Sequence, residues 1–188
     1  MKFLKLTIAS LLTSSALFAG TYNIDVSHSN VGFTVKHMMI TNVSGKFNDV
    51  AGTFEYDEKT NTLTSLSGEI IVASINTANE KRDTHLKADD IFDAEKFPKI
   101  EFKTTKIEDN AVYGDFTMKG VTKNIKLELE NGGVITDPKG NLRAGFELTG
   151  KISRKDFGIT WNKILETGGV TVGDEVKLQI AMEGVSAK

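Results

Sequence analysis

The amino-acid sequence predicts an all-β protein, an extended antiparallel barrel of about eight strands. Apolar and polar residues alternate in one segment after another, as they do in strands that bury one face. Clusters of Asn, Asp, Gly and Lys separate these segments, which indicates short turns and a meander of consecutive strands. Only residues 79–88 suggest a helix of any length.

The individual strands follow from the parity of their apolar residues. Val31, Phe33 and Val35 share one parity, and the residues between them are small or polar. The same period of two returns at 50–56, 66–72, 100–102, 112–118, 125–129, 146–152 and 176–182. Turn-forming residues are found at 57–61, 108–110, 131–133 and 137–141. Residues 79–88 are polar on most faces, so we expect a short surface helix that crosses one end of the barrel.

Several glycines share the parity of the apolar residues in their strands, and they point inward if those residues do. They are Gly52, Gly68, Gly114 and Gly150. Gly within a strand is tolerated where a sheet bends or where another group needs the space. These positions therefore indicate barrel curvature, an internal apolar cavity that could enclose a long, thin molecule, or both. The cavity interpretation predicts a lining that contains Val31, Phe33, Val35, Phe54, Phe102, Gly114, Phe116, Met118, Phe146 and Gly150.

Charged and polar residues that end or follow strands are candidates for the contact with a ligand head group. A charge cannot stay unpaired in an apolar tube, so we expect these side chains at the mouth of the cavity. The candidates are His37, Arg82, Asp83, His85 and Arg154.

Residues 1–19 are predicted to be a secretory signal peptide. Two lysines precede an apolar, hydroxyl-rich run that ends at Phe18, and Ala19 offers a small-residue cleavage point. Ser and Thr interrupt this run, which is shorter than the ~20 apolar residues of a membrane span. We therefore expect an exported protein that does not span a membrane and that folds as one domain over residues 20–188.

The residue types argue against several other functions. The chain has no Cys, which excludes disulfides, thiol chemistry and Cys-ligated zinc. A net charge of −2 with scattered Lys and Arg argues against nucleic-acid binding. Neither a Gly-x-Ser-x-Gly nucleophile motif nor a phosphate-binding glycine loop occurs. We predict no catalytic residue, no resident cofactor and no metal.

Two other hypotheses remain open. His28, His37 and His85 lack the local spacing that places two imidazoles on one metal, but the fold could assemble them into a metal or hydrolytic site. Alternatively, the protein is a stress-protective or adhesion barrel in which aromatic side chains fill the space assigned to a ligand.

Taken from end to end, the chain resembles the YceI family of exported polyisoprenoid-binding proteins. Each matching motif is weak alone, but their order and spacing together are specific. The motifs include Tyr22-Asn23-Ile24-Asp25, His28-Ser29-x-Val31-x-Phe33-x-Val35-x-His37, Gly52-Thr53-Phe54, Arg82-Asp83-x-His85-Leu86-Lys87, Phe97-Pro98-x-Ile100-x-Phe102, Gly120-Val121-Thr122-Lys123 and Arg154-Lys155-Asp156-Phe157-Gly158.

This resemblance implies an extended eight-stranded barrel, lipocalin-like in architecture, that encloses a polyisoprenoid or another long-chain amphipathic lipid. It also implies a periplasmic location, often as a homodimer, and it carries no accepted catalytic constellation. Together with the strand pattern and the glycines, it leads to the hypothesis of a periplasmic protein that carries or stores such a lipid. The identity of the lipid and of any delivery partner stays open.

Overall fold

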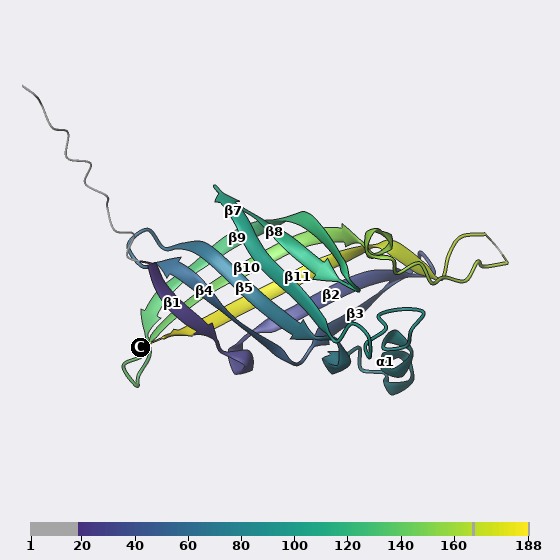
Figure 1. The fold of residues 1–188 in the computed structure, drawn as a ribbon, viewed down its shortest axis with the longest axis horizontal. Helices are drawn as coiled ribbons and strands as arrows, with labels where there is room; N and C mark the ends of the chain where they lie inside the picture. The colour runs from purple at the N-terminus through teal and green to yellow at the C-terminus, as the bar shows by residue number, and fades with distance from the viewer. Residues whose placement is uncertain (1–18, 167, 188) are drawn as a thin grey trace, which may run out of the picture.

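The computed structural model describes residues 19–166 and 168–187 (Figure 1). The predicted signal peptide, residues 1–19, lies outside this part of the chain except for Ala19, which begins the first strand. None of the helices within the described residues is long and apolar enough to cross a membrane.

The predicted antiparallel barrel is confirmed. Its wall follows the order β1-β4-β5-β7-β8-β9-β10-β11 and closes through pairing of β11 with β1, which makes eight strands. Additional strands extend the wall at one end. In chain order the strands are β1 (Ala19–Ile24), β2 (Asn30–His37), β3 (Thr41–Phe47), β4 (Val50–Asp57), β5 (Thr62–Ile71), β6 (Ile75–Asn76), β7 (Lys99–Glu108), β8 (Ala111–Met118), β9 (Val121–Thr136), β10 (Leu142–Ser153) and β11 (Val172–Ser186).

The additional strands are β2, β3 and β6. Each of them continues a strand of the wall after a short break in the chain. β2 follows β1 after the 3₁₀ helix η1 (Val26–His28), and both pair with β11. β3 pairs with β2 and leads into β4, while β6 follows β5 after a second 3₁₀ helix, η2 (Val72–Ser74). β6 pairs with β3, but within the described residues no strand pairs with its other edge. The wall therefore opens beside β6, where the chain leaves the barrel.

The segment that leaves the barrel contains the predicted helix. α1 spans Glu80–Leu86, inside the predicted range 79–88, and Asn79 caps it by accepting a hydrogen bond from the Arg82 amide at 3.0 Å. Figure 1 shows α1 beside the end of β3, outside the barrel wall. The helix is therefore placed next to the opening beside β6.

The predicted turn at 131–133 is wrong, because β9 continues through it. Gly133 pairs with Gly145 and Asn131 pairs with Phe146, so Gly132 is an extra residue in the ladder. This is a β-bulge, and Gly133 has a φ of +103° that a glycine adopts at little cost. The sequence pattern also did not reveal β1, β3 or β6; β3 has the sequence TNVSGKF, in which apolar residues are too few to show a period.

One half of the barrel is filled by side chains. The aromatic residues Tyr22, Phe54 and Tyr56 are at most 1% exposed. Tyr22 stacks on Phe54 with ring centroids 5.3 Å apart, and Phe146 meets Phe54 edge-on at 5.0 Å. The Tyr56 hydroxyl donates to the Asn61 carbonyl at 3.0 Å, so this buried polar group is satisfied. Any space for a ligand must lie toward the other end.

Candidate functional site

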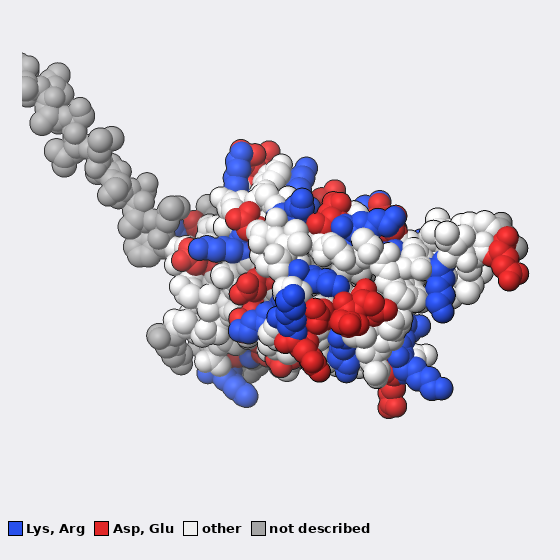
Figure 2. All heavy atoms as spheres, turned by 45° about the vertical axis from the view of Figure 1, so that its right-hand side comes forward, with Lys and Arg blue, Asp and Glu red and all other residues white. Residues whose placement is uncertain are grey.

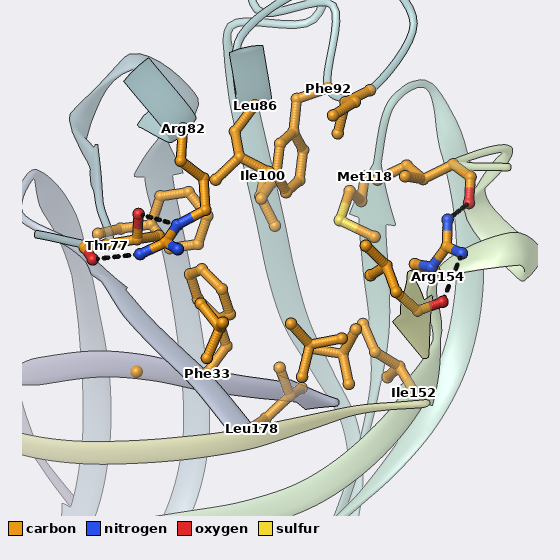
Figure 3. Close-up of a pocket in the computed structure, with 18 of the residues that line it drawn as sticks. Phe33, Thr77, Arg82, Leu86, Phe92, Ile100, Met118, Ile152, Arg154 and Leu178 are labelled. Atoms are coloured by element: carbon orange, nitrogen blue, oxygen red, sulfur yellow. Dashed lines mark hydrogen bonds between the residues drawn. The ribbon is translucent and has the colours of Figure 1, made fainter. Parts of the chain in front are cut away.

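The end of the barrel next to α1 contains a cavity of about 430 Å³. Figure 3 shows it between the strands on one side and the α1 segment on the other. The volume falls in the range of about 300–1,000 Å³ that is usual for small-molecule sites. Its deep part is apolar and includes Ile100, Phe116, Leu178 and Ile180, and its polar residues include His37, Thr77, Lys81, Arg82 and His85.

A smaller cavity of about 50 Å³ lies further inside the barrel. The two cavities share several lining residues, which therefore form the floor of the larger one. They are Val31, Ile70, Ile100, Phe116, Leu178 and Ile180.

The predicted cavity residues divide between these spaces and the filled half of the barrel. Val31, Phe33, Val35, Phe116 and Met118 line the large cavity, and Phe102 lines the small one. Neither cavity contacts Phe54, Gly114, Phe146 or Gly150.

The prediction that Gly114 and Gly150 face a ligand is corrected by their surroundings. A Cβ atom added at Gly114 would fall on the Phe102 ring, and one added at Gly150 would lie 2.5 Å from Cδ2 of Leu127. These glycines therefore make room for neighbouring side chains of the core. Parity identified the inward face correctly, but it does not tell whether the space on that face is already filled.

Arg82 is fixed on the cavity wall by Thr77 (Figure 3). Its Nε donates to Thr77 Oγ1 at 2.7 Å, and its Nη2 donates to the Thr77 carbonyl at 2.8 Å. Asp83 does not line the cavity. Instead its carboxylate accepts bonds from the amide and the hydroxyl of Thr77, at 2.9 and 2.5 Å. Within the described chain Nη1 of Arg82 has no hydrogen-bond partner, so a charged donor remains for a ligand.

Arg154 also lines the cavity, but all of its donors are used by the protein. It belongs to a 3₁₀ helix, η3 (Arg154–Phe157), and is 6% exposed. Nε donates to the Gly173 carbonyl, Nη1 to those of Ile159 and Trp161, and Nη2 to that of Val172 and to the Asp174 carboxylate. Because a guanidinium has five N–H groups, none is left for a head group. Arg154 anchors the following loop, in place of the expected head-group role.

The two remaining head-group candidates lie at the mouth. His85 on α1 meets the Trp161 ring edge-on, with centroids 5.0 Å apart, and its Nε2 lies 3.1 Å from Asp90 Oδ2. The ring contact joins α1 to the loop after η3 across the cavity. His37 ends β2, opposite Val172 of β11. Sequence patterns did not identify Thr77, Lys81 or Trp161 as lining residues; Trp161 is the only Trp of the chain, which was the one signal available.

The structure does not bring the three histidines together. His37 and His85 line the cavity, whereas His28 lies in η1 beside Asp25 and Glu183. Asp25, His28 and Glu183 are near enough to share a metal ion. However, Nη1 of Arg143 lies 2.8 Å from Asp25 Oδ2 and 2.5 Å from Glu183 Oε1. A cation already occupies this cluster, which favours an ion-pair network over a metal site.

This network predicts a stability loss in acid. Hydrogen bonds from Ser27 and then from Arg143 hold the pKa of Asp25 well below its usual range. The Asn141 amide and then Arg143 do the same to the pKa of Asp137. Because both folded-state pKa values are lowered, the stabilisation is complete above the unfolded value of about 4 and is lost as pH falls toward the folded values.

Replacing Arg143 with Met removes one of the causes at each carboxylate. We expect Arg143→Met to be less stable than the wild type near neutral pH and the difference to shrink as the pH falls below about 4. Urea unfolding at a series of pH values measures this. A stability difference that stayed constant down to pH ~2 would contradict the assignment.

Comparisons with known proteins agree with this architecture. The chain matches the YceI-like domain over residues 22–184. The UPF0312 proteins of Staphylococcus aureus strains N315 and Mu50 are 39% identical over 163 residues, which cover 86% of this chain and 95% of each relative. The crystal structure of a Campylobacter jejuni YceI protein superposes with a TM-score of 0.71 at 34% identity, over 81% of this chain and 90% of that one.

A more distant structure shares the fold alone. It is described as a polyisoprenoid binding domain from Saccharophagus degradans implicated in plant cell wall breakdown. It superposes with a TM-score of 0.66 at 13% identity and covers 88% of this chain and 98% of that chain.

Proposed function

Because the chain belongs to the YceI-like family, whose domain it matches over residues 22–184, we propose that it binds an amphipathic lipid in the cavity beside α1. The apolar chain of the lipid lies against the floor, and its polar end lies near Arg82. The observation that carries the proposal is the combination of an apolar interior with a charged, partly unpaired guanidinium on the wall.

Burial of the apolar chain supplies most of the binding energy in this proposal. Each methylene removed from water contributes about 0.8 kcal/mol. The cavity of about 430 Å³ has the size of a site for one small molecule. A long polyisoprenoid therefore inserts one end and leaves the remainder outside, because side chains fill the other half of the barrel.

The residues of the wall favour a ligand whose polar end accepts hydrogen bonds or carries negative charge. Lys36, Lys81 and Arg82 contact the cavity, and no carboxylate of the described residues does. Opposite charges attract strongly where water is excluded. Diphosphates of isoprenoid alcohols and the carbonyl groups of quinones both have this chemistry.

We further propose that the protein carries or stores this lipid outside the cytoplasm. The support is the signal-peptide pattern of residues 1–19 and the low water solubility of long apolar chains. A lipid that must cross an aqueous compartment needs a protein that shields its chain.

Native mass spectrometry combined with organic extraction tests the proposed function. The processed protein is purified from the bacterium without detergent, and we expect a bound small molecule that partitions into the organic phase. A protein that is consistently empty, and that also fails to bind added farnesol or farnesyl diphosphate, would refute lipid binding.

The head-group assignment has its own prediction. We expect Arg82→Gln to lower affinity for farnesyl diphosphate by roughly tenfold, the equivalent of about 1.4 kcal/mol and typical of one lost charge-assisted hydrogen bond. Affinity for farnesol, which has the same chain and no charge, should change much less. Fluorescence competition measures both values, and Lys96→Gln, a charge removal at a residue that does not line the cavity, is the matched control. Equal losses for the two ligands would argue against the assignment.

A further inference from the structure

The apolar residues that remain on the surface are concentrated at one end of the barrel. Six large hydrophobic residues of the described chain are exposed. Three of them, Met38, Met39 and Ile40, form the turn between β2 and β3 and are 41%, 58% and 81% exposed. A fourth, Ile164, is 87% exposed in the loop between η3 and β11.

The two loops that carry these residues lie together at the mouth of the cavity. The Met38 amide donates to the Thr171 carbonyl at 2.8 Å, which ties the β2–β3 turn to the base of the second loop. His37, Trp161 and Thr171, which flank the exposed residues in sequence or in space, line the cavity. Figure 1 shows the second loop projecting beyond the barrel at this end.

The backbone conformation of the turn indicates that its two methionine side chains have a role other than stabilising the fold. Met38 and Met39 have φ values of 48° and 62°, in the left-handed region where Gly, Asn and Asp are favoured. Methionine at both positions adds conformational strain and directs two apolar side chains into water. Neither effect helps the barrel to fold.

We propose that Met38, Met39, Ile40 and Ile164, here called the apolar tips, insert into the surface of a lipid bilayer and bring the cavity mouth against it. The proposal rests on the proposed function, because a ligand with a long apolar chain comes from a membrane and must leave the bilayer where the cavity opens. Apolar side chains bind a membrane surface in this way when they enter the boundary between the lipid headgroups and the acyl chains.

The shape and charge of the apolar tips favour a bilayer over a second copy of the chain. The four apolar side chains are far fewer than the about 20–30 residues per partner that a standard protein interface uses. Figure 2 turns this end forward, and the projecting loop there is largely uncharged with acidic atoms at its tip. Lys36 and Lys163 lie close to the exposed residues in the sequence and Glu166 lies in the same loop, so these three side chains carry a net charge of +1. Lys81 and Arg82 add positive charge at the mouth, so anionic lipid should strengthen binding, but the apolar tips should suffice for a neutral bilayer.

Sedimentation of sucrose-loaded phosphatidylcholine vesicles, with and without phosphatidylglycerol, tests the docking surface. The purified protein is compared with the double variant Ile40→Ser/Ile164→Ser. The control is Ile135→Ser, which removes an Ile that is 68% exposed in β9. We expect both vesicle types to bind the wild type and the control. Loss of two inserted isoleucines should reduce partitioning by roughly tenfold or more.

Several outcomes separate this inference from its alternatives. It is overturned if the wild type does not sediment with vesicles, or if the double variant partitions like the wild type. It is also overturned if the substitutions convert a dimer to a monomer in sedimentation velocity, which would make the apolar tips a contact between copies. If the double variant does not melt cooperatively, it is replaced by Met39→Asn, because asparagine suits the left-handed backbone. The inference is then overturned if Met39→Asn partitions onto vesicles like the wild type. Binding of farnesol and of farnesyl diphosphate without vesicles is measured in parallel: the absence of both counts against the proposed function, whereas vesicle binding decides the docking surface.

Discussion

Replacing Arg154 with Met is expected to lower the free energy of unfolding by about 3–5 kcal/mol, the range for removing one partner of a buried charged network. Arg154 is 6% exposed, and its guanidinium donates to four carbonyls and one carboxylate. The loss leaves those acceptors without partners and frees the loop between η3 and β11 from the barrel. Because this loop forms part of the cavity wall, affinity for farnesol should fall as well.

Two further variants make this test specific. Arg154→Lys keeps the charge but has one nitrogen in place of three, so it should recover little of the stability. Lys155→Met removes a neighbouring cation whose side chain is 50% exposed and pairs with Asp174 at 2.7 Å; a surface pair of this kind contributes about 1 kcal/mol or less. Urea unfolding measures all three. If Arg154→Met and Lys155→Met cost the same, Arg154 is not the anchor of the loop.

Filling the cavity is expected to abolish ligand binding while the fold survives. Val176 on β11 lies between Val35 and Ile152 in neighbouring strands, and all three residues line the cavity. Val176→Trp places an indole where the apolar chain would lie. Displacement of three to four methylenes, at about 0.8 kcal/mol each, lowers affinity by about a hundredfold. Isothermal titration with farnesol measures this, and Val176→Ala, which keeps the space open, should still bind.

The melting temperature distinguishes this variant from an overpacked one. Val176→Trp adds volume to an existing cavity, so we expect near-native melting. Gly114→Leu adds volume where the Phe102 ring already lies, and we expect a loss of about 1–3 kcal/mol without a direct effect on the cavity. If Val176→Trp melted as low as Gly114→Leu, or still bound farnesol with wild-type affinity, the cavity would not be the ligand site.

Much of the barrel could be predicted from local pattern. A strand with one buried face must alternate, because successive side chains point to opposite sides, and β2, β4, β8, β10 and β11 each contain enough alternating apolar residues to show it. The bulge in β9 could not be predicted in this way. Its Asn-Gly-Gly sequence is typical of a turn, and only pairing with Gly145 and Phe146 of β10 shows that the strand continues.

The candidate site was predictable only in part, for a physical reason that Gly114 and Arg154 illustrate. The sequence by itself determined the all-β class, the approximate positions of eight of the eleven strands, their inward faces and the short helix, since these depend on periodicity along the chain. It did not determine which inward positions are filled, because that depends on side chains that reach across from other strands, as Phe102 does to Gly114. Nor did it determine whether a cation is available to a ligand, because Arg82 and Arg154 both line the cavity. Only the tertiary structure shows that four backbone carbonyls and the Asp174 carboxylate occupy every donor of Arg154, whereas Nη1 of Arg82 stays open.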